Sequence, residues 1–206
     1  MTDGFTDLID GANVFFAELA ANNRKDWYEP RKADYAANIR KPAELLSDLF
    51  AQDLAQMTGR TFRPKVFRIH RDVRFSKDKT PYNPHLHLLW TPVADGPAPA
   101  FFFGSSPDYL ILGTGLTALS ADDLTRYRDL VDTQGDALSA AIAGARTGGA
   151  EISDWGPPPL KRVPKPFLPD HPHGDLLRRK ALTISGPLGD DWREAGLVAA
   201  MQRATQ

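Results

Sequence analysis

The spacing of the apolar residues changes twice along this chain, and that change limits the folds it can adopt. Between residues 5 and 58 apolar side chains recur every three or four positions, which is typical of amphipathic helices. Between residues 62 and 116 they alternate with polar ones or form short runs, which favours strands. From 120 to 206 the helical spacing returns around a loop rich in glycine and proline. Helices, then strands, then helices predict an α+β fold.

The strand-rich part contains four candidate strands with short connections. They cover residues 66–75, 85–90, 101–103 and 109–112. Parallel strands need crossovers of a dozen or more residues, so these links predict a mainly antiparallel sheet. We expect about four to six strands, packed by the N- and C-terminal helices. The whole chain, residues 1–206, is expected to form one domain.

Two helical features can be tested directly. Ser120, before Asp122 and Asp123, is expected to cap a helix N-terminus. A helix before Gly59 is expected to bury one apolar stripe. That stripe comprises Leu45, Leu46, Leu49, Phe50, Leu54 and Met57.

Composition excludes several classes of protein. The 206 residues include no cysteine, which rules out a disulfide scaffold, thiolate zinc sites and a cysteine nucleophile. No apolar run reaches the ~20 residues needed to span a bilayer. No basic segment precedes an apolar stretch at the N-terminus, so a secretory signal is not expected. A cytoplasmic protein without a membrane partner is the resulting expectation.

A nearly neutral total hides two basic blocks. Residues 60–82 contain eight basic and two acidic side chains, a charge of +6. Residues 161–180 contain six basic and two acidic ones, a charge of +4. Since the whole chain has a net charge of −1, the remaining residues have a charge of −11. If the two blocks fold near each other, they would focus a positive potential.

The first block suggests a site for an anion. Guanidinium groups at alternate strand positions form a row of donors suited to carboxylate or phosphate, and the following loop adds hydroxyl and ammonium groups. We therefore predict that a phosphate- or carboxylate-bearing small molecule binds on the sheet. The expected ligand-binding residues are Arg68, Arg71, Arg74, Ser76, Lys77, Lys79, Tyr82, Lys161, Arg162 and Lys165. If there is chemistry, Asp72 or His85 is the candidate general base; no cofactor is predicted.

Four other interpretations remain open. Arg71, Asp72 and Arg74 could form an ion-pair network that supports the fold. Basic residues interleaved with aromatic ones are also typical of nucleic-acid-binding modules. A metal-dependent hydrolase could use imidazole and carboxylate ligands; the candidates are His85, His87, His171, His173, Asp72 and Asp170. A structural or protein-interaction domain is the fourth alternative.

The first block also resembles a known family signature. Residues 67–82, followed by His85 and Leu86, are similar to F-R-x-x-R-D-x-R-F-S-K-D-K-T-P-Y…H-L, the signature of a family of hypothetical proteins known only as a domain of unknown function. The likeness extends to residues 22–28, where Asn22 and Asn23 are similar to the start of the family's N-terminal N-N-x-x-x-W-F/Y element, and to blocks within 160–177. Because the family has no established activity, the resemblance implies no reaction. His87 stands where the family tends to have glycine, and Asn83-Pro84 replaces its usual lysine and threonine.

Overall fold

The computed structural model describes residues 4–94, 98–117 and 119–205, which divide into two compact units. Unit 1 comprises residues 1–93, 102–112 and 187–206, and unit 2 comprises residues 94–101 and 113–186. Whether residues 1–206 form one domain depends on how these two units combine, so the single domain stays a prediction.

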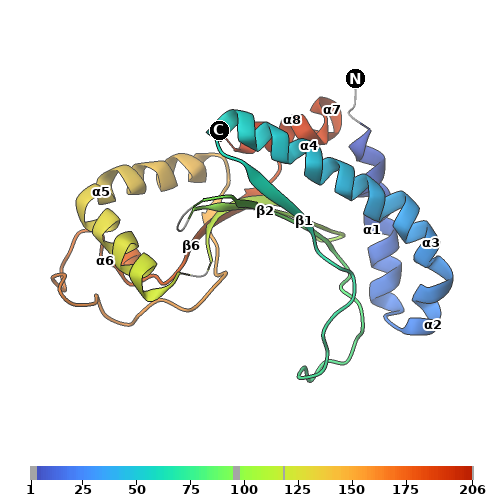
Figure 1. Ribbon diagram of the computed structural model, residues 1–206, viewed down its shortest axis with the longest axis horizontal. Helices are drawn as coiled ribbons and strands as arrows, with labels where there is room; N and C mark the ends of the chain where they lie inside the picture. Colours follow the sequence, from blue (N-terminus) through green and yellow to red (C-terminus); the bar gives the residue numbers. More distant parts are fainter. Residues whose placement is uncertain (1–3, 95–97, 118, 206) are drawn as a thin grey trace. The chain divides into compact units, whose positions relative to one another are not determined.

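Unit 1 contains the N-terminal helices and the end of the chain (Figure 1). Its helical elements are α1 (Phe5–Ala21), α2 (Lys25–Tyr28), η1 (Glu29–Arg31), α3 (Lys32–Tyr35), η2 (Ala36–Arg40), α4 (Lys41–Thr58), α7 (Trp192–Ala195) and α8 (Leu197–Ala204). As predicted, α4 ends at Gly59, which adopts the left-handed conformation that glycine tolerates best (φ 68°).

The buried stripe of α4 is narrower than predicted. Leu46, Phe50 and Leu54 are fully buried, whereas the other three predicted members, Leu45, Leu49 and Met57, are exposed. The buried three are spaced four residues apart, so they form a single row along one face. The apolar stripe that the sequence shows on a helix can therefore be wider than the row of side chains that is buried.

The strands form one six-stranded sheet in the order β1-β2-β3-β4-β6-β5. Their bounds are β1 (Phe62–Val66), β2 (Leu86–Pro92), β3 (Ala100–Ser106), β4 (Tyr109–Leu116), β5 (Glu151–Ile152) and β6 (Leu182–Pro187). β1 pairs antiparallel with β2, placing Phe62 opposite Pro92, and β5 pairs antiparallel with β6. The predicted α+β fold with an antiparallel sheet is confirmed.

Within unit 1, α4 packs on β2 through Trp90. The Trp90 ring is fully buried against Phe50, with 4.9 Å between ring centroids. Its indole Nε1–H donates to the Ser47 carbonyl oxygen over 2.8 Å. A buried indole needs such a partner, so this hydrogen bond fixes the ring's orientation as well as its burial.

The predicted strand over residues 66–75 is wrong. The strand occurs earlier, at Phe62–Val66, and the following residues make only an isolated bridge between His70 and Tyr82. The predicted apolar face also fails at Phe75, whose side chain is 96% exposed. Pro81 and Pro84 in the returning chain lack the N–H groups that a continuous ladder requires. Residues 67–85, called the arm below, therefore leave the sheet as an extended loop between β1 and β2 (Figure 1).

Unit 2 contains α5 (Ala121–Thr147) and α6 (Gly174–Leu177). Ser120 caps α5 as predicted, with its Oγ accepting a hydrogen bond from the Asp123 N–H at 3.2 Å. The helix departs from helical geometry at Gln134, where a kink divides it into two helical segments.

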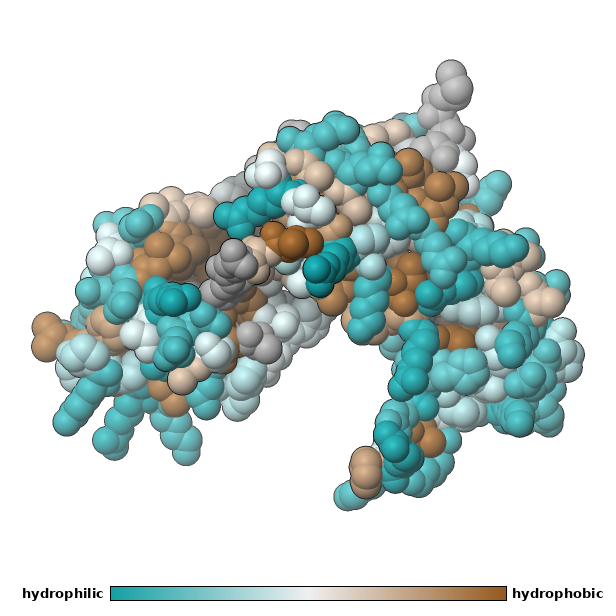
Figure 2. Space-filling model, in the orientation of Figure 1, coloured by the Kyte–Doolittle hydropathy of each residue, from teal (hydrophilic) through white to brown (hydrophobic). Residues whose placement is uncertain are grey.

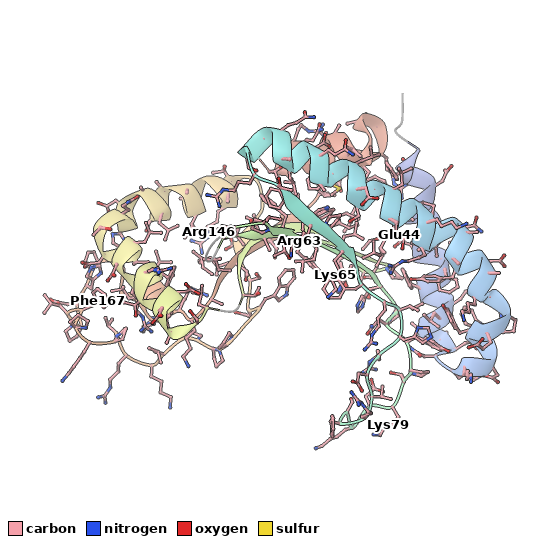
Figure 3. All side chains as sticks on the ribbon, in the orientation of Figure 1. Glu44, Arg63, Lys65, Lys79, Arg146 and Phe167 are labelled. Atoms are coloured by element: carbon pink, nitrogen blue, oxygen red, sulfur yellow. The ribbon has the colours of Figure 1, made fainter. Side chains whose placement is uncertain are left out.

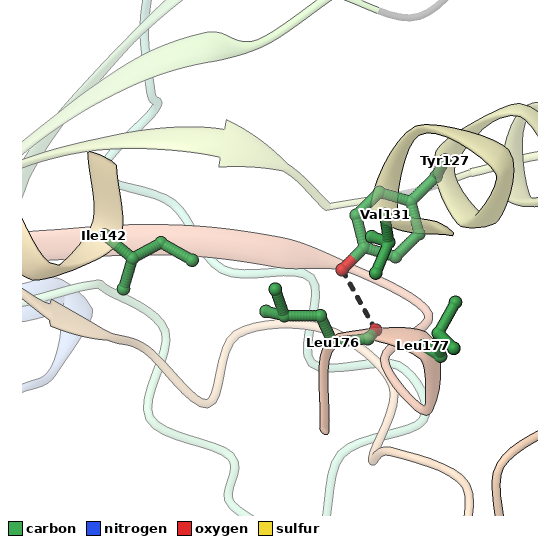
Figure 4. Close-up of a cluster of buried hydrophobic side chains, with 5 residues drawn as sticks. All are labelled: Tyr127, Val131, Ile142, Leu176 and Leu177. Carbon is green, nitrogen blue, oxygen red and sulfur yellow. Dashed lines mark hydrogen bonds between the residues drawn. The ribbon is translucent and has the colours of Figure 1, made fainter. Parts of the chain in front are cut away.

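The α5 and α6 side chains meet in a buried cluster (Figure 4). Its members are Tyr127, Val131, Ile142, Leu176 and Leu177. The Tyr127 hydroxyl donates to the Leu176 carbonyl oxygen at 3.0 Å, so the short helix is held by a hydrogen bond as well as by apolar packing. Among the described residues, no helix combines the length and apolar character needed to cross a membrane.

Candidate functional site

The base of the arm is attached to the helices by Asn23, in the connection between α1 and α2. The Asn23 Nδ2–H donates to the Tyr82 carbonyl oxygen at 2.9 Å, and the Asn23 Oδ1 accepts from the Tyr82 N–H at 3.1 Å. The side-chain amide thus binds the backbone as a neighbouring strand would. This pair gives a structural reason for the asparagine in the N-terminal part of the family signature.

Aromatic rings pack beside this attachment. The Tyr82 ring lies 4.4 Å from Tyr28 and 5.2 Å from His70, measured between ring centroids. Tyr82 is 2% exposed, and burial raises its pKa and that of Tyr28, the latter to about 12. The predicted ligand residue Tyr82 is therefore placed where it supports the arm.

Two ion pairs lie within the arm. The Arg71 Nη1 contacts the Asp78 Oδ2 at 2.5 Å and also hydrogen-bonds to the Thr80 hydroxyl and carbonyl oxygens. The Asp72 carboxylate accepts from the Arg74 Nε at 2.9 Å and the Arg74 Nη2 at 2.7 Å. These contacts agree with the ion-pair interpretation for these residues.

The same contacts lower the pKa of both carboxyls. The Thr80 N–H and the Arg71 guanidinium lower the pKa of Asp78 to about 2. The Arg74 side chain and backbone N–H lower the pKa of Asp72. A lowered pKa makes Asp72 a weaker proton acceptor, so its geometry suits charge pairing better than general-base catalysis.

Other cations of the first block lack such pairs. Arg60, Arg63, Lys65, Arg68, Lys77 and Lys79 are exposed, and none forms an ion pair with a residue that the structure describes. Figure 3 shows Arg63 and Lys65 on β1 and Lys79 near the far end of the arm, and Figure 2 shows mainly hydrophilic residues over that end. The Lys79 ammonium donates to the Val73 carbonyl oxygen at 3.0 Å, which orients its charge without neutralising it.

Phe75 is the most exposed of the large hydrophobic side chains of the arm. Its side chain is 96% exposed, and the Arg74 guanidinium lies 5.9 Å from its ring centroid. Ser76, another predicted ligand residue, is partly buried, and its N–H donates to the Val73 carbonyl oxygen at 3.3 Å. Single exposed apolar side chains are common on protein surfaces, so the Phe75 ring becomes informative only together with the charged groups around it.

His85 and His87 stand side by side where the arm joins β2. Their rings are stacked, with centroids 3.7 Å apart and an interplanar angle of 20°. The His87 Nε2 is 2.8 Å from the Tyr109 hydroxyl oxygen. Burial lowers the pKa of both imidazoles, that of His87 to about 4, with Arg71 adding to the shift at His85. Both rings are therefore neutral at pH 7, which leaves His85 able to accept a proton there.

Metal binding finds no support in the described residues. No group of three or more histidine, aspartate or glutamate side chains among them could hold a metal ion.

The second basic block belongs to unit 2, whereas the arm belongs to unit 1. Lys161, Arg162 and Lys165 are exposed in the segment between β5 and α6. Arg178 pairs with Asp175 at 2.5 Å. The expectation that both blocks form one site stays a prediction.

The comparison with protein families identifies the chain's relatives. A model described as "Conserved hypothetical protein (DUF2461)" matches residues 12–203. The chain belongs to this family. No curated protein and no solved structure matched it. In this DUF2461 protein, the matched span includes the arm, Asn23 and the second basic block.

Proposed function

We propose that the arm of this DUF2461 protein binds single-stranded nucleic acid. The observation that supports this most strongly is Phe75, which is 96% exposed on an extended loop that also contains Arg68, Lys77 and Lys79, three exposed cations without an ion pair to a described residue. Exposed aromatic rings stack on unpaired bases, while lysine and arginine contact the phosphates between them.

The distribution of charge favours a long anion over a compact one. The unpaired cations extend from Arg63 and Lys65 on β1 through Arg68 to Lys77 and Lys79 along the arm. A small phosphate or carboxylate would contact only a few of them, whereas a polynucleotide backbone can contact the whole series. The small-molecule anion site expected from the sequence is therefore the second candidate.

The internal ion pairs have a role in this proposal. Arg71 with Asp78 and Arg74 with Asp72 fix the shape of the loop, and the Asn23 and Tyr28 contacts fix its base. A loop ordered before binding loses less conformational entropy when the ligand arrives. We propose binding at the arm, without a reaction.

The test is fluorescence anisotropy with a fluorescein-labelled 20-mer of deoxythymidine, titrated at several salt concentrations. Phe75→Ala should weaken binding about tenfold or more, since base stacking contributes about 1–3 kcal/mol per base. Lys77→Ala/Lys79→Ala should lower affinity and make the salt dependence shallower by about 1.4 in log–log slope.

The control replaces two exposed lysines of unit 1 that lie outside the arm, Lys25→Ala/Lys32→Ala. It removes the same charge and should change affinity less than threefold. An equal loss in the control would contradict a role for the arm, as would no binding at low salt. If inorganic phosphate or a mononucleotide displaces the 20-mer at stoichiometric concentrations, the compact-anion site becomes the better explanation.

A further inference from the structure

Unit 2 contains a pocket that the arm does not explain. Its volume is about 430 Å³, and its lining includes Ser139 from α5 and His171, His173 and Arg178 from the segment leading through α6. These side chains include a hydroxyl, two imidazoles and a guanidinium within one cavity. The sequence analysis considered the two histidines only as metal ligands.

His173 connects a hydroxyl and a carboxylate. Its Nδ1 is 3.2 Å from the Ser139 Oγ, and its Nε2 is 3.1 Å from the Asp136 Oδ1. This second contact is an ion-pair distance to a fully exposed carboxylate, and it favours a proton on Nε2 because a carboxylate can only accept. With that tautomer, Nδ1 is the acceptor and the Ser139 O–H donates to it. This is the order of a nucleophile, its base and a charged group that orients the base.

His171 shows what is special about His173. The His171 Nε2 is 3.0 Å from the Asp132 Oδ1, but its Nδ1 accepts the His173 backbone N–H at 3.1 Å. Both imidazoles therefore have a carboxylate partner, and only His173 has an alcohol at its free nitrogen. His171 can therefore be compared with His173 within the same protein.

Helix α5 leaves space for the His173 ring. α5 departs from helical geometry at Gln134, and the next residue is Gly135. A Cβ on Gly135 would lie 2.5 Å from the His173 Cγ, which is far closer than van der Waals contact. The absence of a side chain there lets the imidazole approach the helix and reach Ser139 on its next turn.

A cationic donor shares the pocket. The Arg178 Nε is buried and makes no hydrogen bond to any described residue, while its Nη2 donates to the Asp175 Oδ1. A buried N–H without a partner is costly, and a shift of the side chain, which is 36% exposed overall, would let it meet a ligand oxygen. This observation is independent of the Ser139 and His173 contacts.

We propose that this pocket hydrolyses small carboxylic esters, with Ser139 as the nucleophile. The Ser139 Oγ attacks the acyl carbon as its proton passes to the His173 Nδ1, and Arg178 stabilises the negative charge on the carbonyl oxygen. The C–O bond to the alcohol breaks, and the alcohol leaves with the proton from His173. Water then attacks the acyl-serine, giving its proton to His173, and the acid leaves as Ser139 recovers its proton. Asp136 orients the ring throughout.

The experiment measures hydrolysis of p-nitrophenyl acetate by the full chain, with the labelled residue mapped by mass spectrometry after reaction with a fluorophosphonate. Ser139→Ala and His173→Asn should each lower the enzymatic rate at least 100-fold. Labelling should occur at Ser139 and disappear in the His173 variant. Melting temperatures of the variants report whether they remain folded, and Ser139→Thr keeps a hydroxyl if the alanine variant unfolds.

His70→Asn is the control, because this histidine lies in unit 1 and outside the pocket. It should retain the rate within about threefold. In His171→Asn, the asparagine preserves an acceptor for the His173 N–H. A wild-type rate equal to that of Ser139→Ala, or labelling at another residue, would overturn the proposal. An equal loss in His171→Asn and His173→Asn would assign the histidines to holding the segment on α5.

Discussion

The chain contains two His-x-His sequences whose surroundings are opposite in kind. His85 and His87, at the start of β2, stack on each other 3.7 Å apart. His171 and His173, before α6, have ring centroids 5.8 Å apart, and each contacts a carboxylate. The spacing in the sequence is the same, and the electrostatic environment differs completely.

Local backbone and burial produce this difference. A strand places residues i and i+2 on one face, which brings the first pair of rings together. There burial disfavours the charged imidazole and lowers the pKa of His87 to about 4. In unit 2, Asp132 and Asp136 lie on either side of the kink at Gln134 in α5, and each meets one imidazole. A His-x-His motif therefore has no chemistry of its own until its neighbours are known.

Among the variants that test the difference between the two His-x-His pairs, Gly135→Ala should have the largest effect. The new Cβ would overlap the His173 ring, so we expect a loss of about 2–3 kcal/mol in the free energy of unfolding and displacement of the imidazole from Ser139. Denaturant unfolding measures the first, and labelling of Ser139 the second. Gly144→Ala is the control on the same helix, because a Cβ there meets nothing within 4 Å. It should be neutral or stabilising by up to about 1 kcal/mol, and a similar loss in both variants would mean that the His173 clash is unimportant.

The next largest effect is expected in the pH dependence of stability, which should distinguish the His85 and His87 pair from the His171 and His173 pair. Because the folded pKa of His87 is about 4 and the ordinary value is 6.5, the unfolded chain binds more protons between those pH values. Stability is thus highest above about pH 6.5 and falls as the pH drops to about 4, by about 1–2 kcal/mol once solvent screening is allowed for.

His87→Gln should flatten this part of the profile, measured by chemical unfolding at a series of pH values. Asp78, with a pKa of about 2, loses its stabilising charge at lower pH and does not obscure the window. A profile as steep in the variant as in the wild type would show that another group titrates here.

Tyr109→Phe tests the hydrogen bond to His87. The Tyr109 hydroxyl oxygen lies 2.8 Å from the His87 Nε2, and removal of the hydroxyl should cost about 1 kcal/mol. A hydroxyl that donates to Nε2 favours the neutral ring, so its loss should raise the pKa of His87 and make the pH dependence shallower; a hydroxyl that accepts should give the opposite change. Tyr127→Phe, which removes a hydroxyl bound to a backbone carbonyl in unit 2, should cost a similar amount and leave the pH dependence unchanged. Equal pH profiles for both variants would argue against the coupling.

The smallest effect is expected from Asp132→Asn. The carboxylate is half-exposed, and ion pairs at such positions contribute about 0–1 kcal/mol. We expect a stability change under about 1 kcal/mol at pH 7, measured by denaturant unfolding and compared with Asp170→Asn, an exposed residue without an ion pair in the described structure. A loss above about 2 kcal/mol in the free energy of unfolding would mean that the His171 and His173 pair is buried as strongly as the His85 and His87 pair.

The sequence predicted the elements whose causes are local. Leu46, Phe50 and Leu54 have the spacing of a buried helix row, and Ser120 has the hydroxyl that a helix N-terminus needs. The arm was mistaken for a strand because Phe67, Ile69, Val73 and Phe75 alternate in the sequence, and an extended loop has the same two-residue period as a paired strand. Only pairing distinguishes them, and pairing is not local.

The contacts that define the candidate sites could not be predicted for the same reason. Asn23 meets Tyr82 across 59 positions, and Ser139 meets His173 across 34. The second meeting also depends on the space left by Gly135. The one sequence signal was the asparagine of the family signature, which marked Asn23 without revealing its partner. The sequence shows where the basic residues are, but it does not show which of them form ion pairs within the protein.

The attachment of the arm at Asn23 and at the His70–Tyr82 bridge has a consequence for proteolysis. Trypsin cleaves after lysine and arginine, and the exposed Arg74, Lys77 and Lys79 all lie beyond that attachment. A single cut there would produce two chains that stay associated, since both cut ends remain fastened to unit 1 by the bridge and the core. The nicked protein would migrate as one species under native conditions and as two after denaturation. The far end of the arm is thus a natural place to insert a tag or exchange a peptide.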